Sequence, residues 1–271
     1  IHYSTVDLLP GKRFVVAMYH SHPLLKVALQ RQMLVSMILF ALFLCLISVI
    51  GYINIVRFRE LIGAQKAIIS SLAELAERRD PETGRHLERT RYYALVLAKQ
   101  LRKNKKYRKI VTNEFIKDLY DAAPLHDIGK VGIRDSILLK KSKLTDEEYE
   151  DMKEHVRIGK QVLQDAIDKF KLKQSFLIVG RNICTYHHER YNGKGYPEGL
   201  KGKEIPLEAR IFALCDAYDA IRSKRSYKNV STHEEAVKKI ESDSGKHFDP
   251  DIVDIFLKCE KEFLQVSSIY K

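Results

Sequence analysis

An uncharged run of 24 residues, from position 33 to position 56, constrains this chain more than any other feature. About 20 apolar residues are enough for a helix to cross the hydrocarbon core of a bilayer. We therefore predict a transmembrane helix over residues 33–56. A buried core helix is the alternative, although uncharged runs of this length are rare in soluble domains. A cleaved signal peptide is disfavoured, because the run is too long and lacks an obvious small-residue cleavage site.

Residues 1–32 are too few to form a domain alone, and we expect them to be the tail of an extracytoplasmic sensor region. The segment predicts a turn at Pro10-Gly11 and a short apolar strand over residues 14–18. The first residue is Ile1, so we expect the sequence to be part of a longer protein. Basic residues lie on both sides of the uncharged run and do not decide its orientation.

Residues 57–80 continue the helical pattern beyond the uncharged run. Five positions recur at alternating steps of four and three residues: Leu61, Gln65, Ile68, Leu72 and Leu75. This heptad-like spacing predicts a linker helix that pairs as a signalling coiled coil, with an ordinary amphipathic helix as the alternative. Asp80-Pro81 breaks the pattern, because a residue before proline avoids the helical region. We therefore place a domain boundary there and a second domain over residues 81–271.

The composition narrows the classes of protein. With 45% hydrophobic and 30% charged residues the chain is not a disordered one. Its four cysteines lie far apart without a CxxC pair, which excludes a disulfide scaffold and a cysteine-based zinc finger. The net charge is +12, which favours an anionic membrane leaflet or an anionic ligand. We expect no nucleic-acid polymer as a partner, since basic and aromatic residues are not interleaved.

The second domain has a helical period almost throughout. Leu87, Arg91, Ala94, Leu97 and Leu101 form one stripe, and Ile252, Phe256, Cys259 and Phe263 form another. Thr145 and Glu148 have the spacing of a capping box, which predicts a helix running through Leu163. A glycine-rich segment over residues 191–202 predicts one long loop. The fold class that follows is all-α.

Several histidines lie close in the sequence to carboxylates or to other histidines, and this pattern suggests metal binding. The candidates are Glu82, His86, His126, Asp127, His155, His187, His188 and Asp216. Imidazole and carboxylate are natural ligands of iron, manganese and zinc. Eight such groups exceed the needs of a single ion, which predicts two or more metals that share a carboxylate and activate water against a phosphate. Taken singly, each histidine is explained as well by packing or solvation. His2, His233 and His247 lie in no such group of candidate ligands, and we expect them at the surface.

Four segments combine these residues with characteristic neighbours: HDIGKVGI (126–133), HHERYNGKGYPEGL (187–200), ARIFALCDAYDAI (209–221) and GKHFDP (245–250). Together they resemble the HD-GYP family, a branch of the HD phosphohydrolases, over residues 70–265. The resemblance implies a helical bundle with a non-haem iron or manganese site that hydrolyses cyclic di-GMP. The expected architecture is therefore an HD-GYP bundle preceded by one transmembrane helix and a linker helix.

The resemblance also implies a role for each candidate residue. Asp127 would bridge two metals, with His126, His155, His187, His188 and Asp216 completing a binuclear site. Glu82 and His86 match ligands that some members use for a third metal. We therefore expect two or three divalent ions, iron in preference to manganese.

The implied substrate contacts are basic. Lys130 would contact one phosphate of the substrate, and Arg225 and Lys228 would hold the other. A doubly anionic dinucleotide needs cations, and arginine binds phosphate through two donors. A solvated basic face is the alternative for Arg225 and Lys228. Tyr196 and Pro197 in the GYP loop would orient the histidine pair and offer a docking site for a protein partner.

These inferences lead to a membrane-anchored signalling enzyme. We expect it in the bacterial inner membrane, single-pass in this sequence, with a cytoplasmic domain that cleaves cyclic di-GMP to pGpG or GMP. The linker helix predicts a homodimer. One alternative is a hydrolase acting on a different nucleotide, such as a cyclic GMP-AMP phosphodiesterase. Another is a cyclic di-GMP receptor without turnover.

Overall fold

The computed structural model describes residues 2–10, 12–18, 23–77, 85–171, 175–223 and 231–270, with side chains from residue 23 onward and at Pro10. The chain divides into two compact units, Ile1–Ala64 and Gln65–Lys271. Three predicted site residues, Glu82, Arg225 and Lys228, lie outside the described residues.

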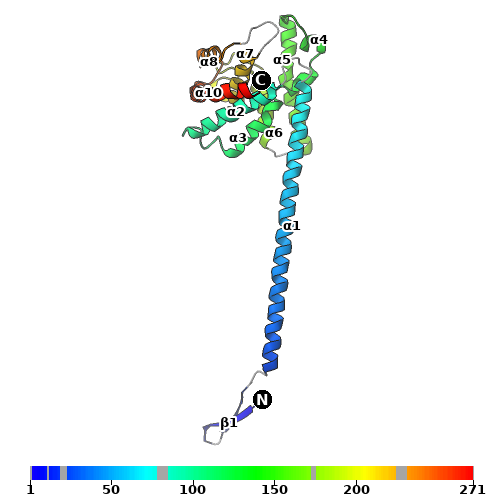
Figure 1. Ribbon diagram of the computed structural model, residues 1–271, viewed down its shortest axis with the longest axis vertical. Coiled ribbons are helices and arrows are strands. Elements are labelled where there is room, and N and C mark those ends of the chain that lie inside the picture. The colour runs from blue at the N-terminus through cyan, green and yellow to red at the C-terminus, as the bar shows by residue number, and fades with distance from the viewer. Residues whose placement is uncertain are drawn as a thin grey trace. The chain divides into compact units, whose positions relative to one another are not determined.

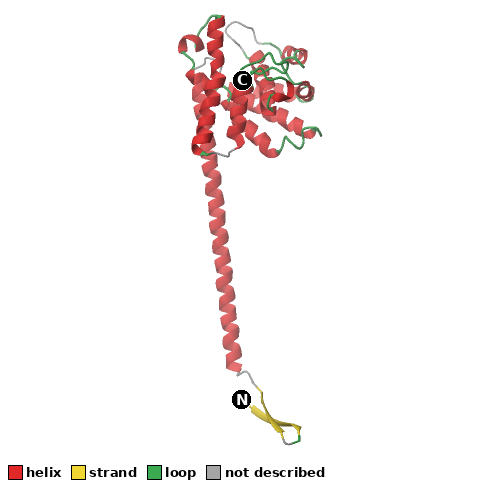
Figure 2. Cartoon of the chain, turned by 180° about the vertical axis from the view of Figure 1, so that it is seen from behind, coloured by secondary structure: helices red, strands yellow, loops and turns green. Residues whose placement is uncertain are grey.

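The first unit begins with a hairpin of two antiparallel strands, β1 (His2–Leu9) and β2 (Lys12–Met18) (Figure 2). The predicted strand therefore exists, although it begins at Lys12 and has a partner strand that the sequence did not suggest. Pro10 lies in the connecting turn, as predicted, and Gly11 lies outside the described residues.

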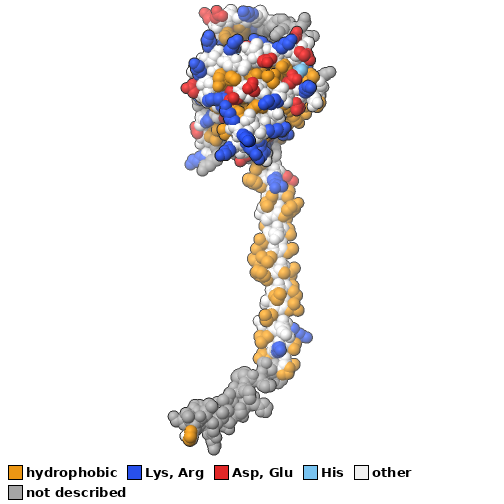
Figure 3. All heavy atoms as spheres, turned by 90° about the vertical axis from the view of Figure 1, so that its left-hand side faces the viewer, with side chains coloured by type: hydrophobic (Ala, Val, Ile, Leu, Met, Phe, Trp, Pro, Cys, Tyr) orange, Lys and Arg blue, Asp and Glu red, His pale blue; other side chains and the backbone are white. Residues whose placement is uncertain are grey.

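The uncharged run lies within a single helix, α1 (Pro23–Glu77), of 55 residues (Figure 1). At about 1.5 Å per residue, 20 residues of such a helix match the thickness of a bilayer core. Hydrophobic side chains cover this part of its surface (Figure 3), and none of its most apolar stretch is buried. Helix α1 is thus long and apolar enough to span a membrane. The predicted linker helix is its direct continuation, not a separate element.

The second unit is a helical bundle, and its described part contains no strand (Figure 2). Helix α6 (Ser175–Tyr186) packs against α3 (Asn113–Ala122), α5 (Asp146–Phe170) and α7 (Leu207–Arg222), while α2 (His86–Lys103) packs against α3 and α7. The smaller helices are η1 (Ala123–Leu125), η2 (Ile128–Gly132), α4 (Asp135–Leu138), η3 (Gly202–Glu204), α8 (His233–Ser242), α9 (Pro250–Phe256) and α10 (Glu260–Ile269).

Local signals in the sequence account for several of these helices. The predicted capping box is present at the start of α5: Glu148 N donates to Thr145 Oγ1 at 3.2 Å, and Thr145 N donates to Glu148 Oε2 at 2.8 Å. The helix then continues past Leu163 to Phe170. The glycine-rich segment over residues 191–202 is a loop, closed by a single bridge between Asn192 and Lys201 and ending in the first residue of η3.

Aromatic side chains fill the main core between α2, α7, α9 and α10. Tyr93 stacks on Phe263 with ring centroids 4.7 Å apart and meets Tyr218 edge-on at 5.1 Å. The predicted C-terminal stripe is buried, but a turn divides it between α9 and α10. Burial of such rings supplies much of the stability of a helical bundle.

The prediction for His233 is wrong, because this side chain is only 7% exposed. Its Nδ1 lies 2.8 Å from the hydroxyl of Tyr218, and its Nε2 lies 3.0 Å from the carboxylate of Glu260. Position 233 follows the N-cap Thr232, and the first turn of α8 directs the imidazole into the core. His247 is partly buried and stacks on Phe248, and the side chain of His2 is outside the described ones.

Candidate metal centre

The His126-Asp127 pair lies in a tight connection between η1 and η2. Its neighbours Leu125 and Ile128 both pack into a hydrophobic cluster, so the chain is anchored on each side of the pair. This anchoring aims both polar side chains into the middle of the bundle. Asp127 Oδ2 lies 3.1 Å from His126 Nε2 and 2.9 Å from Lys130 Nζ.

Four predicted ligands form a first cluster around Asp127. The ligand atoms of Asp127, His155, His187 and His188 all lie within 4.8 Å of one another. Asp127 Oδ1 is 3.3 Å from His155 Nε2 and 3.7 Å from His187 Nε2. These three atoms are buried without a hydrogen-bond partner. Buried polar atoms are rarely left unpaired in a folded protein, so a shared missing partner, such as a cation, accounts for all three.

Three more predicted ligands form a second cluster. The ligand atoms of His86, His126 and Asp216 also lie within 4.8 Å of one another. His86 Nε2 is 3.4 Å from His126 Nε2 and 3.6 Å from Asp216 Oδ1. Because His126 also contacts Asp127, the two clusters are neighbours. Seven of the eight predicted ligands are thus brought together, and the eighth, Glu82, lies outside the described residues.

Helix geometry orients the histidines of both clusters. The Nδ1 atoms of His126, His155 and His187 lie 3.0, 2.7 and 3.0 Å from the backbone carbonyls of residues 123, 152 and 183. A carbonyl oxygen only accepts hydrogen bonds, so each Nδ1 donates and each Nε2 is directed to the centre. This is the arrangement by which proteins fix metal-binding imidazoles.

Asp219 orients His86, and the sequence analysis did not identify it. Its Oδ2 lies 2.8 Å from His86 Nδ1, and the carboxylate also accepts hydrogen bonds from Arg89 Nε at 2.7 Å and Nη2 at 2.9 Å. The spacing in the sequence could have indicated this residue. Asp219 follows Asp216 by three residues on one helix and therefore shares its face. Burial alone would raise the pKa of Asp219, but the hydrogen bonds from His86 and Arg89 lower it to about 2.

Burial and charge prepare the ligands for a cation. Burial lowers the pKa of His155, lowers that of His187 to about 4, and holds that of His188 well below its usual value. Burial would raise the pKa of Asp127, but Lys130 and His126 outweigh it and hold that pKa well below its usual range. The first cluster therefore offers neutral imidazoles and an anionic carboxylate at neutral pH, which is the donor set that a divalent metal requires.

The GYP loop closes one side of the first cluster. The ring of Tyr196 stacks on His188 with centroids 4.8 Å apart, in agreement with the predicted packing against the histidine pair. Gly195 is required there, because a Cβ atom would lie 2.3 Å from the backbone nitrogen of Arg190. Glu189, which the sequence analysis did not single out, is 2% exposed and accepts hydrogen bonds from the backbone of Glu198 and Gly199. It therefore fixes the shape of the loop.

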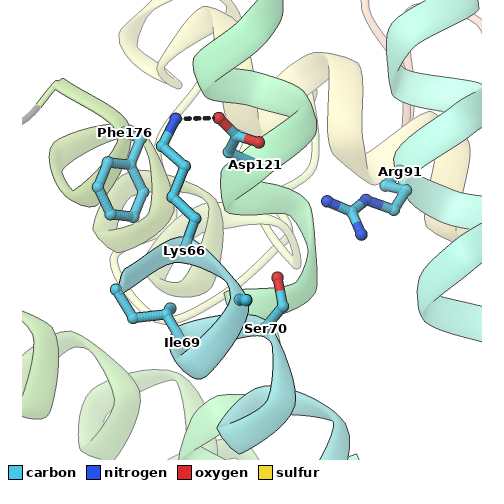
Figure 4. A pocket seen from close by; sticks show the side chains of 7 residues that line it. Lys66, Ile69, Ser70, Arg91, Asp121 and Phe176 are labelled. Atoms are coloured by element: carbon cyan, nitrogen blue, oxygen red, sulfur yellow. Dashed lines mark hydrogen bonds and ion pairs between the residues drawn. The ribbon is translucent and has the colours of Figure 1, made fainter. Parts of the chain in front are cut away.

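A separate pocket of about 270 Å³ lies near the C-terminal end of α1 (Figure 4). It is lined by Lys66, Ala67, Ile69, Ser70, Arg91, Asp121 and Phe176 and includes none of the candidate metal ligands. Lys66 makes an ion pair with Asp121 and lies over the ring of Phe176. The pocket therefore marks where α1 meets α2, α3 and α6, not the site of chemistry.

Comparison with protein families agrees with this geometry. Residues 70–252 match the HD domain family, a span that contains all the candidate ligands. This chain belongs to the HD domain family. Divalent metals are bound by HD phosphohydrolases, and the His/Asp clusters of this HD domain are suited to hold them.

Several curated proteins are similar to this HD domain chain. A "Probable cyclic di-GMP phosphodiesterase" of Vibrio cholerae is 46% identical over 211 residues, which are 78% of this chain and 48% of that protein. A "Cyclic di-GMP phosphodiesterase" of Thermotoga maritima is 43% identical, over 73% of this chain and 50% of that protein. The "3'3'-cGAMP-specific phosphodiesterase 2" of V. cholerae is 35% identical, over 79% of this chain and 38% of that protein. The chain thus spans about half the length, or less, of these relatives.

Proposed function

We propose that this HD domain protein is a metal-dependent phosphodiesterase that hydrolyses cyclic di-GMP to pGpG, GMP or both. The observation that carries the proposal is the pair of adjacent ligand clusters joined at the His126-Asp127 pair. Relatives named as cyclic di-GMP phosphodiesterases, 43–47% identical to the chain, support this choice of substrate. The HD-GYP motifs support the same branch of the family.

The proposed cofactor is a set of two or three divalent ions, iron in preference to manganese. Asp127, His155, His187 and His188 would hold one ion, and His86, His126 and Asp216 a second. Glu82 would contribute to a third. When bound, such ions lower the pKa of water and polarise a phosphate.

The protein's own groups would bind and orient the substrate. Asp127 supplies the negative charge at the junction of the two clusters, and its hydrogen-bonding neighbours restrict its rotation. Lys130, one turn further on, is proposed to contact a phosphate oxygen of the dinucleotide. Arg225 and Lys228 are proposed to hold the second phosphate through charge-assisted hydrogen bonds. The GYP loop is also a proposed docking site for a protein partner.

Two other functions compete with this proposal. The similarity to a cGAMP-specific phosphodiesterase over 79% of the chain favours cyclic GMP-AMP as the second candidate substrate. A receptor that binds cyclic di-GMP without turnover is the third candidate. Loss of a metal ligand would favour it, but the described candidate positions all carry side chains that can bind metal.

We also propose that α1 anchors the protein in the bacterial inner membrane, with the HD domain in the cytoplasm, and that α1 pairs with a second copy. Leu61, Ile68, Leu72 and Leu75 of the heptad-like stripe are 56–63% exposed, which leaves them available to a partner helix. Sedimentation of the detergent-solubilised chain tests the pairing, and Leu72→Asp should convert the dimer to a monomer.

The deciding experiment uses the full chain purified in detergent without oxygen. Elemental analysis would give the metals per chain, and chromatography would follow cyclic di-GMP in the same sample. Two or three ions of iron or manganese with GMP or pGpG as product would support the proposal. A metal-loaded protein that leaves cyclic di-GMP intact would overturn it, and cyclic GMP-AMP would then be tested. Arg225→Ala should retain the metals and raise KM.

A further inference from the structure

His188 is held differently from the other two histidines of the first cluster. The Nδ1 atoms of His155 and His187 lie 2.7 and 3.0 Å from backbone carbonyls, and these contacts fix both rings. Among the described residues, the imidazole of His188 has no hydrogen-bond partner, and its contacts are with other rings. The orientation of this candidate ligand therefore depends on the side chains that pack against it.

Tyr196 of the GYP loop packs most nearly parallel to this imidazole. Its ring centroid lies 4.8 Å from that of His188, at an interplanar angle of 24°, which is a stacked arrangement. His155 and His187 meet the same imidazole at larger angles, 89° and 41°. Both of them are candidate ligands themselves. Within the described part of the chain, Tyr196 is thus the one ring outside the ligand set that stacks on His188.

Lys153, on α5, lies against the ring of Tyr196. Its Nζ is 5.3 Å from the centroid of Tyr196 and 4.8 Å from that of Tyr149, one turn earlier on the same helix. The carboxylate of Glu150 lies 2.6 Å from the same ammonium. An ammonium within about 6 Å of a ring centroid is attracted by the electrons of the ring. Tyr149 and Glu150 therefore hold Lys153 where it attracts Tyr196.

A second lysine joins α5 to the same loop. Lys160 Nζ lies 3.0 Å from Glu198 Oε1, two residues after Tyr196. Lys153 and Lys160 are about two turns apart, so they share one face of α5. The Lys160 and Glu198 side chains are 43% and 42% exposed, and an ion pair so exposed contributes little. The Lys153 side chain is only 25% exposed, so its contact is the stronger of the two links.

We propose that Lys153 is a positioning residue that keeps the ring of Tyr196 stacked on His188 and thereby orients this imidazole for metal binding. The inference rests on the proposed function of the centre and deepens it, because Lys153 lies outside the ligand set. Lys153 is two residues before His155 on α5. The helix therefore supplies one candidate ligand directly and supports a second through the GYP loop.

The first test compares Lys153→Met, which removes the charge of the side chain, with Lys169→Met. Lys169 is an exposed residue of α5 whose Nζ lies 5.6 Å from the ring of Phe170, about 24 Å further along the helix axis. When the metal-free full chain is titrated with Mn²⁺ in detergent, Lys153→Met should weaken one binding step by roughly three- to tenfold. Lys153→Arg and Lys169→Met should bind Mn²⁺ like the wild type, because a guanidinium makes the same contact with a ring.

A double-mutant cycle shows whether Lys153 acts through Tyr196. Tyr196→Leu should weaken the same step, whereas Tyr196→Phe, which keeps the ring, should not. In the Tyr196→Leu background, Lys153→Met should change Mn²⁺ affinity by less than about 1.5-fold, because residues that act as a unit are not additive. Full additivity would overturn the inference. A lower melting temperature of Lys153→Met with unchanged Mn²⁺ affinity would also overturn it, since the contact would then only stabilise the fold.

Hydrogen–deuterium exchange tests the support of the loop without metal or turnover. The backbone N–H of Tyr196 lies within hydrogen-bonding distance of the carbonyl of His188, at 3.4 Å. In the metal-free chain, peptides that cover residues 191–200 should exchange several-fold faster in Lys153→Met, because the loop opens locally more often. Lys169→Met should leave their exchange unchanged. Equal exchange in Lys153→Met and the wild type would refute the inference.

Turnover distinguishes this role from a direct contact with substrate. At saturating Mn²⁺, Lys153→Met should regain most of the wild-type kcat for cyclic di-GMP, with KM unchanged. A raised KM together with unchanged Mn²⁺ affinity would show that Lys153 binds the substrate, and would overturn the inference while the proposed function stands. Weaker Mn²⁺ binding and faster exchange in a protein that does not cleave cyclic di-GMP would support the inference while the proposed substrate fails.

Discussion

The two ligand clusters differ in how they are held without a metal. In the first, Asp127, His155 and His187 each leave a buried ligand atom without a hydrogen-bond partner. In the second, His86 is engaged by Asp219, and Asp216 is 25% exposed to solvent. Three candidate ligand atoms of the first cluster therefore lack a hydrogen-bond partner, while the candidate ligand His86 of the second cluster is hydrogen-bonded to Asp219.

The protonation states follow the same division. Burial lowers the pKa values of the three histidines in the first cluster. In the second, burial also disfavours the charged imidazole of His126, but Asp127 outweighs it and raises that pKa to about 9. The pKa of His86 is raised as well, because its hydrogen bond to Asp219 outweighs burial. From this difference we predict that the first cluster binds metal more tightly and fills first.

Loss of the carboxylate between the clusters should have the largest effect. Asp127→Ala should remove bound metal and lower kcat by at least about a thousandfold, because metal and hydrolysis depend on the same side chain. Elemental analysis and an activity assay on one sample measure both. Asp165→Ala, on the exposed face of α5, should behave like the wild type. Full activity in Asp127→Ala would show that the centre is wrongly assigned.

One histidine from each cluster tests whether the clusters are unequal. His187→Ala should leave less than one metal per chain and reduce kcat by about 100-fold or more, because it opens the tighter cluster. His86→Ala should retain about one metal and lower kcat by roughly 10-fold. Metal content after dialysis distinguishes the two variants. Equal losses would contradict the comparison.

The hydrogen bond behind His86 should contribute less than a ligand does. Asp219→Asn removes the negative charge that fixes the imidazole, so the affinity of the second metal should fall by roughly 10-fold while the first stays bound. Titration of the metal-free protein with Mn²⁺ would show a change in the weaker step only. Asp254→Asn, at an exposed position, is the matched control. A change in the tighter step would instead mean that the clusters act as one.

The smallest effect is a difference in proton release. At pH 7.5 the metal-free His126 holds a proton, since its pKa is about 9, whereas His187, with a pKa of about 4, does not. Filling both clusters should therefore release at least about one proton in all, because His126 must lose its proton before it can bind metal. Overall metal affinity should drop about tenfold per unit as pH falls below 9. Calorimetry in buffers of different ionisation enthalpy counts these protons, and binding without proton release would contradict the assigned protonation of His126.

The sequence predicted those features that depend on short-range patterns. The uncharged run, the capping box of Thr145 and the all-helical bundle follow from neighbours within a few residues of one another. The candidate ligand set was predicted from side-chain type, because metals require particular side chains, whatever the fold around them.

Contacts between distant segments were not predictable in this way. His86 and Asp219 are 133 positions apart, and only the packing of α2 on α7 brings them together. His233 has no sequence neighbour that indicates its burial against Tyr218 and Glu260. The end of the predicted linker helix packs against Leu125 through Ala73, and no local pattern in the sequence indicates this contact.

The helical elements, the candidate membrane span and the choice of candidate ligands could therefore be predicted from the sequence alone, since each depends on local periodicity or on side-chain type. The structure was needed to show how the described candidate ligands divide into two clusters, which of their atoms lack a partner, and which carboxylate supports His86. Those properties depend on distances between segments far apart in the chain, and packing of the whole bundle sets these distances.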